Sequence, residues 1–176
     1  MTMSITLEGK RILAVDDEPD VLETLGDLLP MCRLVTASTF EEAKELLETQ
    51  EFDIAILDIM GVGGYKLLDI TRKKEIPAVM LTAHALTPGS IVKSFKEGAD
   101  SYIPKEEMSN IENFLIDVLK SRKEGKNPWK KWEEKLPSSY FEKRLGAAWK
   151  DKNKEFWETF REVIREKKKS KTPEDT

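Results

Sequence analysis

The sequence predicts an α/β fold with a parallel sheet, followed by a helical extension. Over the first two thirds of the 176 residues, five short apolar runs alternate with segments whose apolar residues recur at helical spacing. The apolar runs are mostly β-branched or aliphatic, which is typical of strands buried on both faces. After residue 121 this alternation stops, and the chain becomes rich in lysine and tryptophan. We therefore expect five strand-helix units and then a separate helical segment.

The expected elements follow one another in order along the first part of the chain. The five strands are expected at Arg11 to Val15, Leu34 to Ala37, Ile54 to Leu57, Ala78 to Leu81 and Ser101 to Ile103. The five helices are expected at Asp20 to Leu29, Phe40 to Thr49, Tyr65 to Lys74, Ser90 to Glu97 and Met108 to Ser121. Thr39 and Glu42 have the spacing of a capping box at the start of the second helix. The fifth helix carries one apolar face, formed by Ile111, Phe114, Leu115, Val118 and Leu119.

The chain after the fifth helix divides into three parts. Residues 122–127 are expected to be a charged linker, in which Gly125 stops the preceding helix. Residues 128–168 are expected to form the helical extension, and residues 169–176 a disordered tail. The first part, residues 1–121, would then be a domain with its own core.

Within the extension, the pattern predicts a short helix and then one long amphipathic helix or two shorter ones. Pro128 to Leu136 fits the short helix, and Ser139 with Glu142 offers a second capping box. Large apolar side chains then recur at helical spacing, at Phe141, Leu145, Trp149, Phe156, Phe160, Val163 and Ile164. About 45 residues cannot bury a large core of their own, so we expect this aromatic face to dock on the first domain or on a second copy.

Charge is distributed unevenly between the two parts. Residues 1–120 carry 12 Lys and Arg against 22 Asp and Glu, whereas residues 121–176 carry 17 against 11. The net charges are therefore −10 and +6. The basic part could meet nucleic acid, an acidic protein or the first part of the chain itself.

The single cysteine and the lack of long apolar runs indicate a cytoplasmic protein. Cys32 has no partner for an intramolecular disulfide, and its apolar surroundings favour a buried structural thiol. No stretch approaches about 20 uninterrupted apolar residues, so neither export nor a membrane span is expected.

Polar side chains stand where the predicted strands end. Asp16 and Asp17 follow the first strand, Asp58 the third, Thr82 the fourth and Lys105 the fifth. Ligands of parallel α/β sheets bind beyond the carboxyl ends of the strands, so these side chains should converge. Three carboxylates in one place repel one another, and a divalent cation keeps them ionised. Ligands that are all oxygen atoms favour Mg²⁺, and a carboxylate, a metal ion, a hydroxyl and a lysine together suit phosphoryl transfer.

Each of these residues alone has an ordinary structural explanation. An aspartate after a strand is often a helix N-cap, and a lone threonine or lysine there is unremarkable. The functional interpretation depends on their joint occurrence, in order, at the strand ends.

Residues 10–121 resemble the receiver domain of two-component response regulators. The similarity lies in four segments: Arg11-Ile-Leu-Ala-Val-Asp-Asp-Glu-Pro19, Phe52-Asp-Ile-Ala-Ile-Leu-Asp58, Val79-Met-Leu-Thr-Ala83 and Gly98-Ala-Asp-Ser-Tyr-Ile-Pro-Lys105. The resemblance implies a flavodoxin-like (βα)5 doubly wound parallel sheet with strand order 2-1-3-4-5, an order that a receiver protein exemplifies.

The resemblance also implies a role for each residue of the predicted site. Asp58 would be the phosphoacceptor, and Asp16, Asp17 and the backbone carbonyl of Met60 would complete the Mg²⁺ site. Thr82 would hydrogen-bond the phosphoryl group, Lys105 would pair with it, and Tyr102 would act as the aromatic switch. The expected partner is a sensor histidine kinase or a phosphotransfer protein.

The sequence departs from the family at two places and carries one histidine near the site. The loop after Asp58 is two residues shorter and glycine-rich, so the Met60 carbonyl is the least secure ligand. Pro104 precedes Lys105 and Glu106 follows it, so the sequence gives no basis for assuming the family's usual cis peptide after the lysine. His84 is a loop residue near the site mouth or, by the resemblance, a residue that tunes dephosphorylation.

Three functions compete. The leading one is a signalling switch with at most slow self-dephosphorylation, which is not an enzyme in the usual sense. The second is a DNA-binding regulator acting through the basic extension. Lysines would supply phosphate contacts there, but no helix-turn-helix is evident, which argues against sequence-specific binding. The third is a Mg²⁺-dependent phosphohydrolase, which needs an acid-base carboxylate at the position of Met60.

Overall fold

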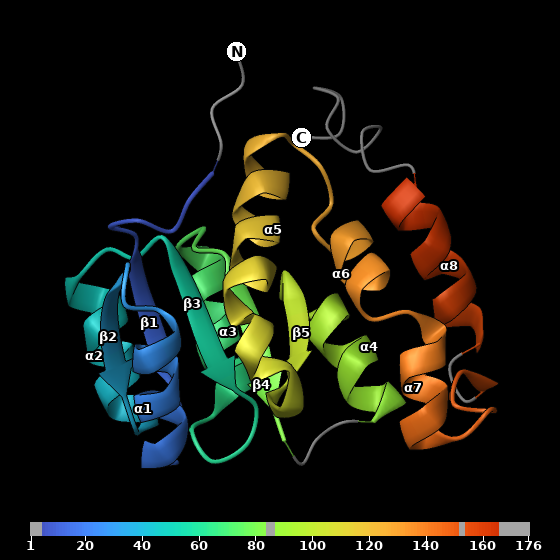
Figure 1. The fold of residues 1–176 in the computed structure, drawn as a ribbon, viewed down its shortest axis with the longest axis horizontal. Coiled ribbons are helices and arrows are strands. Elements are labelled where there is room, and N and C mark those ends of the chain that lie inside the picture. The colour runs from blue at the N-terminus through green and yellow to red at the C-terminus, as the bar shows by residue number, and fades with distance from the viewer. Residues whose placement is uncertain (1–4, 84–86, 152–153, 166–176) are drawn as a thin grey trace.

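Five parallel strands form one sheet in the computed structural model, which describes residues 5–83, 87–151 and 154–165. The strands are β1 (Arg11–Val15), β2 (Arg33–Ala37), β3 (Ile54–Asp58), β4 (Ala78–Thr82) and β5 (Ser101–Pro104). Their order is β2-β1-β3-β4-β5, with every neighbouring pair parallel (Figure 1). The predicted flavodoxin-like order is therefore confirmed.

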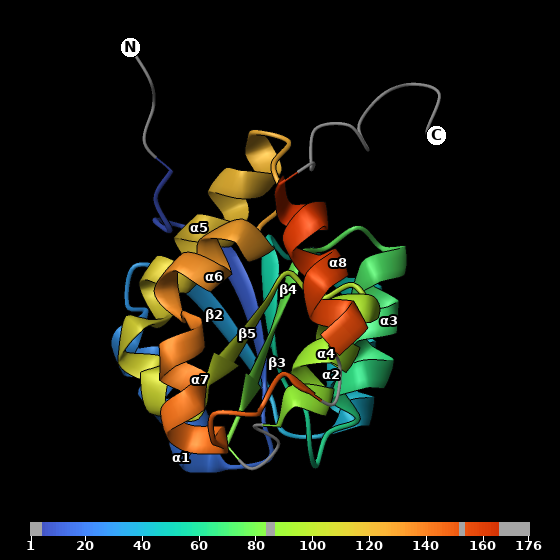
Figure 2. The same ribbon diagram turned by 90° about the vertical axis from the view of Figure 1, so that its right-hand side faces the viewer.

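Helices cover both faces of the sheet. Figure 2 shows α1 (Pro19–Leu28) and α5 (Ile111–Lys123) on one face, and α2 (Phe40–Thr49), α3 (Gly64–Lys73) and α4 (Pro88–Lys96) on the other. Every residue of β3 and β4 is buried, because the inner strands meet helices on both sides.

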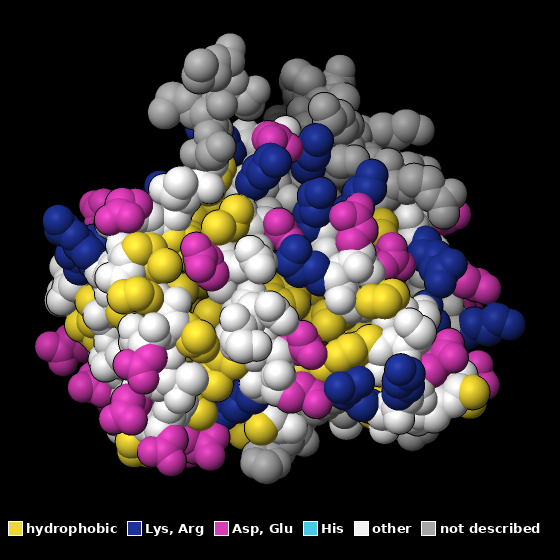
Figure 3. Space-filling view, viewed as in Figure 1, with side chains coloured by type: hydrophobic (Ala, Val, Ile, Leu, Met, Phe, Trp, Pro, Cys, Tyr) yellow, Lys and Arg dark blue, Asp and Glu magenta, His cyan; other side chains and the backbone are white. Residues whose placement is uncertain are grey.

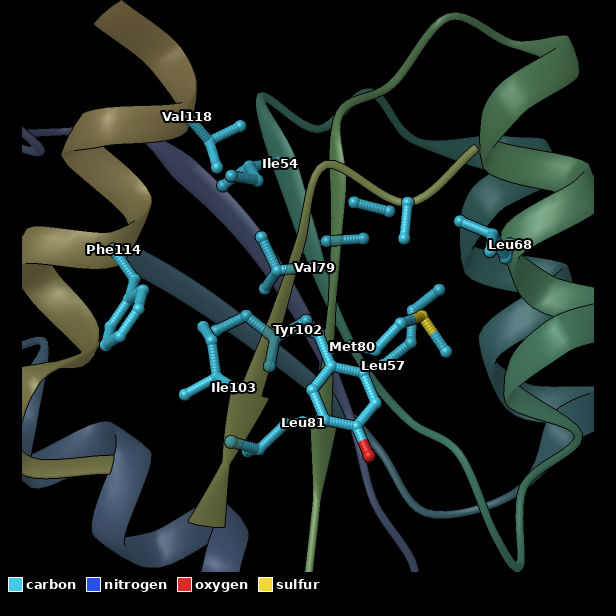
Figure 4. Packing of buried hydrophobic residues seen from close by; sticks show 14 of the residues in the cluster. Ile54, Leu57, Leu68, Val79, Met80, Leu81, Tyr102, Ile103, Phe114 and Val118 are labelled. Atoms are coloured by element: carbon cyan, nitrogen blue, oxygen red, sulfur yellow. The ribbon is translucent and has the colours of Figure 1, made fainter. Parts of the chain in front are cut away.

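Neighbouring residues of β5 face opposite sides of the sheet. Ile103 points toward Phe114 of α5, whereas Tyr102 points to the other side of the sheet, where Leu68 of α3 lies (Figure 4). Both side chains are fully buried. The edge strand thus contributes to both halves of the core, as the period of two along a strand requires.

The helix starts confirm some predicted caps and add another. Thr39 Oγ1 accepts a hydrogen bond from the Glu42 N–H at 3.1 Å, as expected. The Glu42 carboxylate returns to the N–H of Ser38 rather than to that of Thr39. At α4, Thr87 and Ser90 form a complete capping box, so this helix begins at Pro88, two residues earlier than predicted.

The segment between β5 and α5 is less regular than the sequence predicts. A 3₁₀ helix, η1 (Lys105–Asn110), precedes α5, and the expected helix start at Met108 lies within it. The end of α5 is fixed by Arg122, which donates two hydrogen bonds to Asp100, at 2.9 and 3.0 Å. Asp100 also accepts from the N–H of Ala78, which joins α5 to the start of β4.

Three short helices make up the described part of the extension. They are α6 (Trp129–Lys135), α7 (Ser138–Leu145) and α8 (Lys154–Arg165). The predicted capping box at Ser139 is wrong, because α7 already begins at Ser138 and no side chain caps it. The predicted aromatic stripe is divided between two helices, with Trp149 in the turn after α7. The tail predicted at residues 169–176 lies outside the described residues.

The extension packs against the α/β part of its own chain, beside α4 and the open edge of β5 (Figures 1 and 2). The indole N–H groups of Trp129 and Trp132 donate to the backbone carbonyls of Ala99 and Tyr102, both at 2.7 Å. The ring of Phe95, on α4, contacts three extension rings with centroid distances of 5.0–5.4 Å, those of Trp129, Phe156 and Phe160. The expected docking of the aromatic face is thus present within one chain.

The surface repeats the charge asymmetry of the sequence. In the view of Figure 3, acidic side chains gather at the lower left, over α1, while most lysines and arginines lie over α5 and the extension. Among the described residues, no helix is both long enough and apolar enough to cross a membrane.

Candidate functional site

Three aspartates meet at the carboxyl ends of β1 and β3. The two strands are parallel neighbours, with Val15 beside Leu57, so the residues that follow lie side by side. Asp16, Asp17 and Asp58 each offer a carboxylate oxygen within 4.8 Å of the other two. Asp16 and Asp58 are 1% and 5% exposed, whereas Asp17 lies at the surface. The site is therefore buried on the protein side and open beyond Asp17.

Lys105 reaches into this cluster from the end of β5. Its Nζ lies 2.7 Å from Glu18 Oε1, 2.9 Å from Asp16 Oδ2 and 3.5 Å from Asp58 Oδ1. Thr82 ends β4, between Asp58 and Lys105 in the strand order, and is buried. A pocket of about 260 Å³ joins these groups, lined by Asp17, Glu18, Asp58, Met60, Gly61, Thr82, Ala83 and Lys105.

Burial and like charge both act on Asp58. Burial of the carboxyl group, and next the negative charge of Asp16, raise the pKa of Asp58 to about 7, although the Lys105 ammonium acts in the opposite direction. Burial lowers the pKa of Lys105, but hydrogen bonds to Glu18 and Asp16 outweigh this effect and raise it above its ordinary value. Lys105 is thus a permanent cation beside a carboxyl group that resists ionisation.

The loop after β3 depends on glycine at two positions. A Cβ at Gly61, which has φ +85°, would lie 2.4 Å from Asp17 Oδ2. A Cβ at Gly64 would lie 2.1 Å from the backbone oxygen of Asp58. The short loop therefore packs directly against the acidic cluster, and its glycines make that approach possible. Met60, between them and Asp58, has a 59% exposed side chain at the pocket wall.

The donor set fits a small divalent cation. All its side-chain ligands are carboxylate oxygens, which Mg²⁺ prefers. Asp16 Oδ1 accepts from the N–H of Glu18 at 2.9 Å, whereas the buried Oδ2 faces the Lys105 ammonium, also at 2.9 Å. The Asp16 carboxylate thus already lies against one cation, and its neighbours Asp17 and Asp58 supply further oxygen atoms for a second.

Tyr102 links the strand beside Lys105 to the first turn of α4. Its hydroxyl shares a 2.6 Å hydrogen bond with Ser90 Oγ, and its ring is fully buried. Burial raises the pKa of Tyr102 above its ordinary value, so the hydroxyl stays protonated at neutral pH.

Comparison with known proteins assigns this arrangement to a family. The model of the response regulator receiver domain matches residues 12–115, more than half of the chain. The chain belongs to the response regulator receiver family. Receiver domains are signalling switches that bind Mg²⁺ at an acidic pocket.

The receiver of this chain is similar to both plant and microbial proteins. It is 35% identical over 118 residues to the two-component response regulator ARR18 of Arabidopsis thaliana, an alignment covering 61% of this chain and 18% of that protein. The chain thus matches only about a fifth of that relative's length. Among solved structures, a CheY-like receiver domain protein from Methanospirillum hungatei JF-1 is 28% identical, with a TM-score of 0.58, and the alignment covers 67% of this chain and all of that one. The BeF₃-activated receiver domain of DrrB is 25% identical, with a TM-score of 0.56, over 64% of this chain and 98% of that one.

The structure brings together most of the site residues that the sequence predicts for the receiver. Asp16, Asp17, Asp58, Thr82 and Lys105 converge, and Met60 lines the same pocket. No cis peptide bond occurs in the described parts of the chain, in keeping with the altered sequence around Lys105. His84 lies outside the described residues.

Sequence reasoning missed two polar partners. Glu18 pairs with Lys105, and Ser90 pairs with Tyr102. The signals for both were present, since Glu18 directly follows the two aspartates, and Ser90 stands three residues after Thr87, at the spacing of a capping box.

Proposed function

We propose that this chain is a response regulator that is phosphorylated on Asp58 in a Mg²⁺-dependent reaction and thereby changes its interactions with partner proteins. The observation that carries the proposal is the setting of Asp58. Its buried carboxylate lies within 4.8 Å of two other carboxylates, and the Lys105 ammonium is 3.5 Å away. The division into a receiver (1–121), a linker (122–127) and an extension (128–168) belongs to the same proposal.

Asp58 acts as the nucleophile. One carboxylate oxygen attacks the phosphorus of a phosphohistidine on a sensor kinase or phosphotransfer protein. The new O–P bond forms as the P–N bond breaks, and the departing imidazole takes up a proton. Lys105 pairs with a phosphoryl oxygen, and the Thr82 hydroxyl donates a hydrogen bond to another. The product is an acyl phosphate on the Asp58 side chain.

Asp16, Asp17 and Asp58 would hold Mg²⁺, together with the backbone carbonyl of Met60. When bound, the ion neutralises the negative charge that accumulates on the carboxylates and the phosphoryl oxygens. It would also keep Asp58 ionised at neutral pH, where burial and Asp16 oppose ionisation.

The position two residues after Asp58 holds no acid-base side chain. A phosphohydrolase of this type would need a carboxylate two residues after the nucleophile, where Met60 stands. We therefore propose slow self-dephosphorylation and a switching role rather than an enzymatic turnover.

The proposal is tested by phosphorylation of the full chain with a small phosphodonor and Mg²⁺. We expect one phosphoryl group per chain, stable in acid and labile to hydroxylamine, and no labelling of Asp58→Asn. Asp69→Asn is the matched control, because it removes the same charge from a partly exposed site on α3. Labelling that persists in Asp58→Asn, or that occurs equally in the presence of a chelator, would contradict the proposal.

A further inference from the structure

Two contacts join the extension to residues next to the phosphorylation machinery. The first is a clasp, formed by Tyr140 and Arg144 of α7 around the carboxylate of Glu106. The second is the hydrogen bond from the indole of Trp132, on α6, to the backbone carbonyl of Tyr102. Glu106 directly follows Lys105 in the chain, so both contacts reach β5 and η1 within a few residues of the site.

The clasp has the geometry of a strong ion pair. Arg144 donates from Nε and from one terminal nitrogen to the two oxygens of Glu106, at 2.6 and 3.1 Å, and the Tyr140 hydroxyl donates at 3.0 Å. The guanidinium also lies over the Tyr140 ring, 3.7 Å from its centroid. A bidentate Arg–carboxylate pair fixes the relative orientation of the two groups as well as their distance. Glu106 is therefore held in one position relative to α7.

The indole contact fixes the neighbouring part of β5. Trp132 is 3% exposed, and its N–H satisfies a carbonyl on the strand edge that β4 does not pair. On the other side of the same residue, the Tyr102 hydroxyl is bonded to Ser90 in the first turn of α4. Phe95, near the end of α4, packs against extension rings. The extension thus touches β5 and α4 together and holds them in one arrangement.

That arrangement already has the groups that a phosphoryl oxygen needs. Lys105 Nζ lies 3.5 Å from Asp58, and Thr82 lines the same pocket. Side chains that are already held in place do not lose conformational entropy when a phosphoryl group binds, so their prior ordering favours the phosphorylated state.

We propose that docking of the extension and phosphorylation of Asp58 are positively coupled through these two contacts. Arg144, Tyr140 and Trp132 are then positioning residues that act through Glu106, Lys105 and Tyr102. Coupling between two binding events is reciprocal, so the phosphorylated state must also tighten the docking of α7. The inference rests on the proposed phosphorylation of Asp58.

The test measures an equilibrium rather than an activity. Beryllofluoride is the probe, as in the activated DrrB receiver to which this chain is similar, and its binding in the presence of Mg²⁺ is followed by calorimetry on the full chain. We expect Arg144→Gln combined with Tyr140→Phe to weaken binding about fivefold, the lower end of ordinary coupling between sites. Lys143→Gln is the control, since it removes a charge from an exposed neighbour on α7. Arg144→Lys should restore part of the affinity.

A second pair of variants tests the indole contact. Trp132→Phe keeps an aromatic ring but removes the N–H that reaches Tyr102, and we expect weaker beryllofluoride binding here as well. Trp157→Phe is the matched control, because the described residues offer no acceptor to its buried indole N–H. Thermal unfolding of each variant shows that the chain remains folded.

The reciprocal measurement is amide hydrogen exchange. Beryllofluoride with Mg²⁺ should slow exchange in α7 of the wild-type chain, and should have no such effect in the clasp variant. Equal affinities of the test and control variants, or faster exchange in α7, would overturn the coupling. Failure of beryllofluoride to bind the wild-type chain, with no labelling of Asp58, would instead overturn the proposed function.

Discussion

Asp58 makes the stability of the metal-free protein depend on pH. Because its folded-state pKa is raised to about 7 from the ordinary 3.8, the folded state binds the proton more tightly than the unfolded state does. The stability should therefore fall as pH rises between these two values, and the penalty is complete above pH 7. The proposed cation site and phosphoryl acceptor would carry this cost whenever no cation is bound.

Asp58→Asn should remove that penalty, because asparagine does not ionise. We expect the variant to gain more stability relative to wild type at pH 8 than at pH 5, by on the order of 2 kcal/mol. The measurement is denaturant unfolding in a chelator at both pH values, with Asp69→Asn as the control that should gain nothing. Mg²⁺ should stabilise the wild type at pH 8 but not Asp58→Asn. An equal effect of the substitution at both pH values would contradict the assigned pKa.

At the residue scale, the sequence could predict which side chains converge, because topology sets their positions. Asp16 directly follows β1, Asp58 and Thr82 are the last residues of β3 and β4, and parallel strands align their ends. Glu18 and Ser90 were missed because their roles depend on the side chains they meet, Lys105 and Tyr102. Those contacts depend on loop geometry, which the hydrophobic periodicity of the sequence does not encode.

At the element scale, the loop between β3 and α3 shapes the open side of the acidic cluster. It is short, and it approaches Asp17 closely at Gly61. Gly61→Ala should push a methyl group into the Asp17 carboxylate, and also strain a backbone with φ +85°. We expect about tenfold weaker Mg²⁺ binding, which corresponds to about 1.4 kcal/mol.

Gly9→Ala separates the two effects in that prediction. Gly9 also has a positive φ, +71°, but a Cβ there would meet nothing within 4 Å. The Gly9→Ala substitution should therefore lower the free energy of unfolding by about 1 kcal/mol without changing Mg²⁺ affinity. Mg²⁺ titration of both variants checks this, and equal affinities for Gly61→Ala and wild type would show that Asp17 is not a ligand.

Element types were predicted well, but their ends less so. All five strands were found, since buried parallel strands have an apolar signature that does not depend on distant contacts. The predicted start of α7 was wrong because Ser139 resembles an N-cap in the sequence, whereas the backbone is already helical from Ser138, directly after Pro137. The split of the aromatic stripe has a similar cause, because Gly146, with φ +94°, ends α7 while the hydrophobic period continues past it.

At the scale of the whole molecule, the extension completes the core instead of forming a second one. The rings of Trp129, Phe160 and Phe95 contact one another across the junction between α4 and the extension. Opposite net charges of the two parts favour the same docking, but exposed charge pairs contribute little in salt. The sequence could predict docking from the lack of burial available to a short extension, but not the surface used, because that depends on the open edge of β5 and on Phe95.

A shared core should make the receiver and the extension unfold together. All four tryptophans lie in the extension, so tryptophan fluorescence follows its unfolding, whereas far-UV circular dichroism follows the helices and strands of the whole chain. We expect the two signals to give the same denaturant midpoint, as a single cooperative transition requires.

Truncation after Arg122 keeps the ion pair with Asp100 but uncovers Phe95 and the edge of β5. The truncated receiver should remain folded and accept phosphate, but with stability lower by a few kcal/mol, since burying one large apolar side chain contributes about 1.5 to 3 kcal/mol. If fluorescence instead changes at a lower denaturant concentration than circular dichroism, and truncation leaves the midpoint of the receiver unchanged, the extension is a separate unit rather than part of its core.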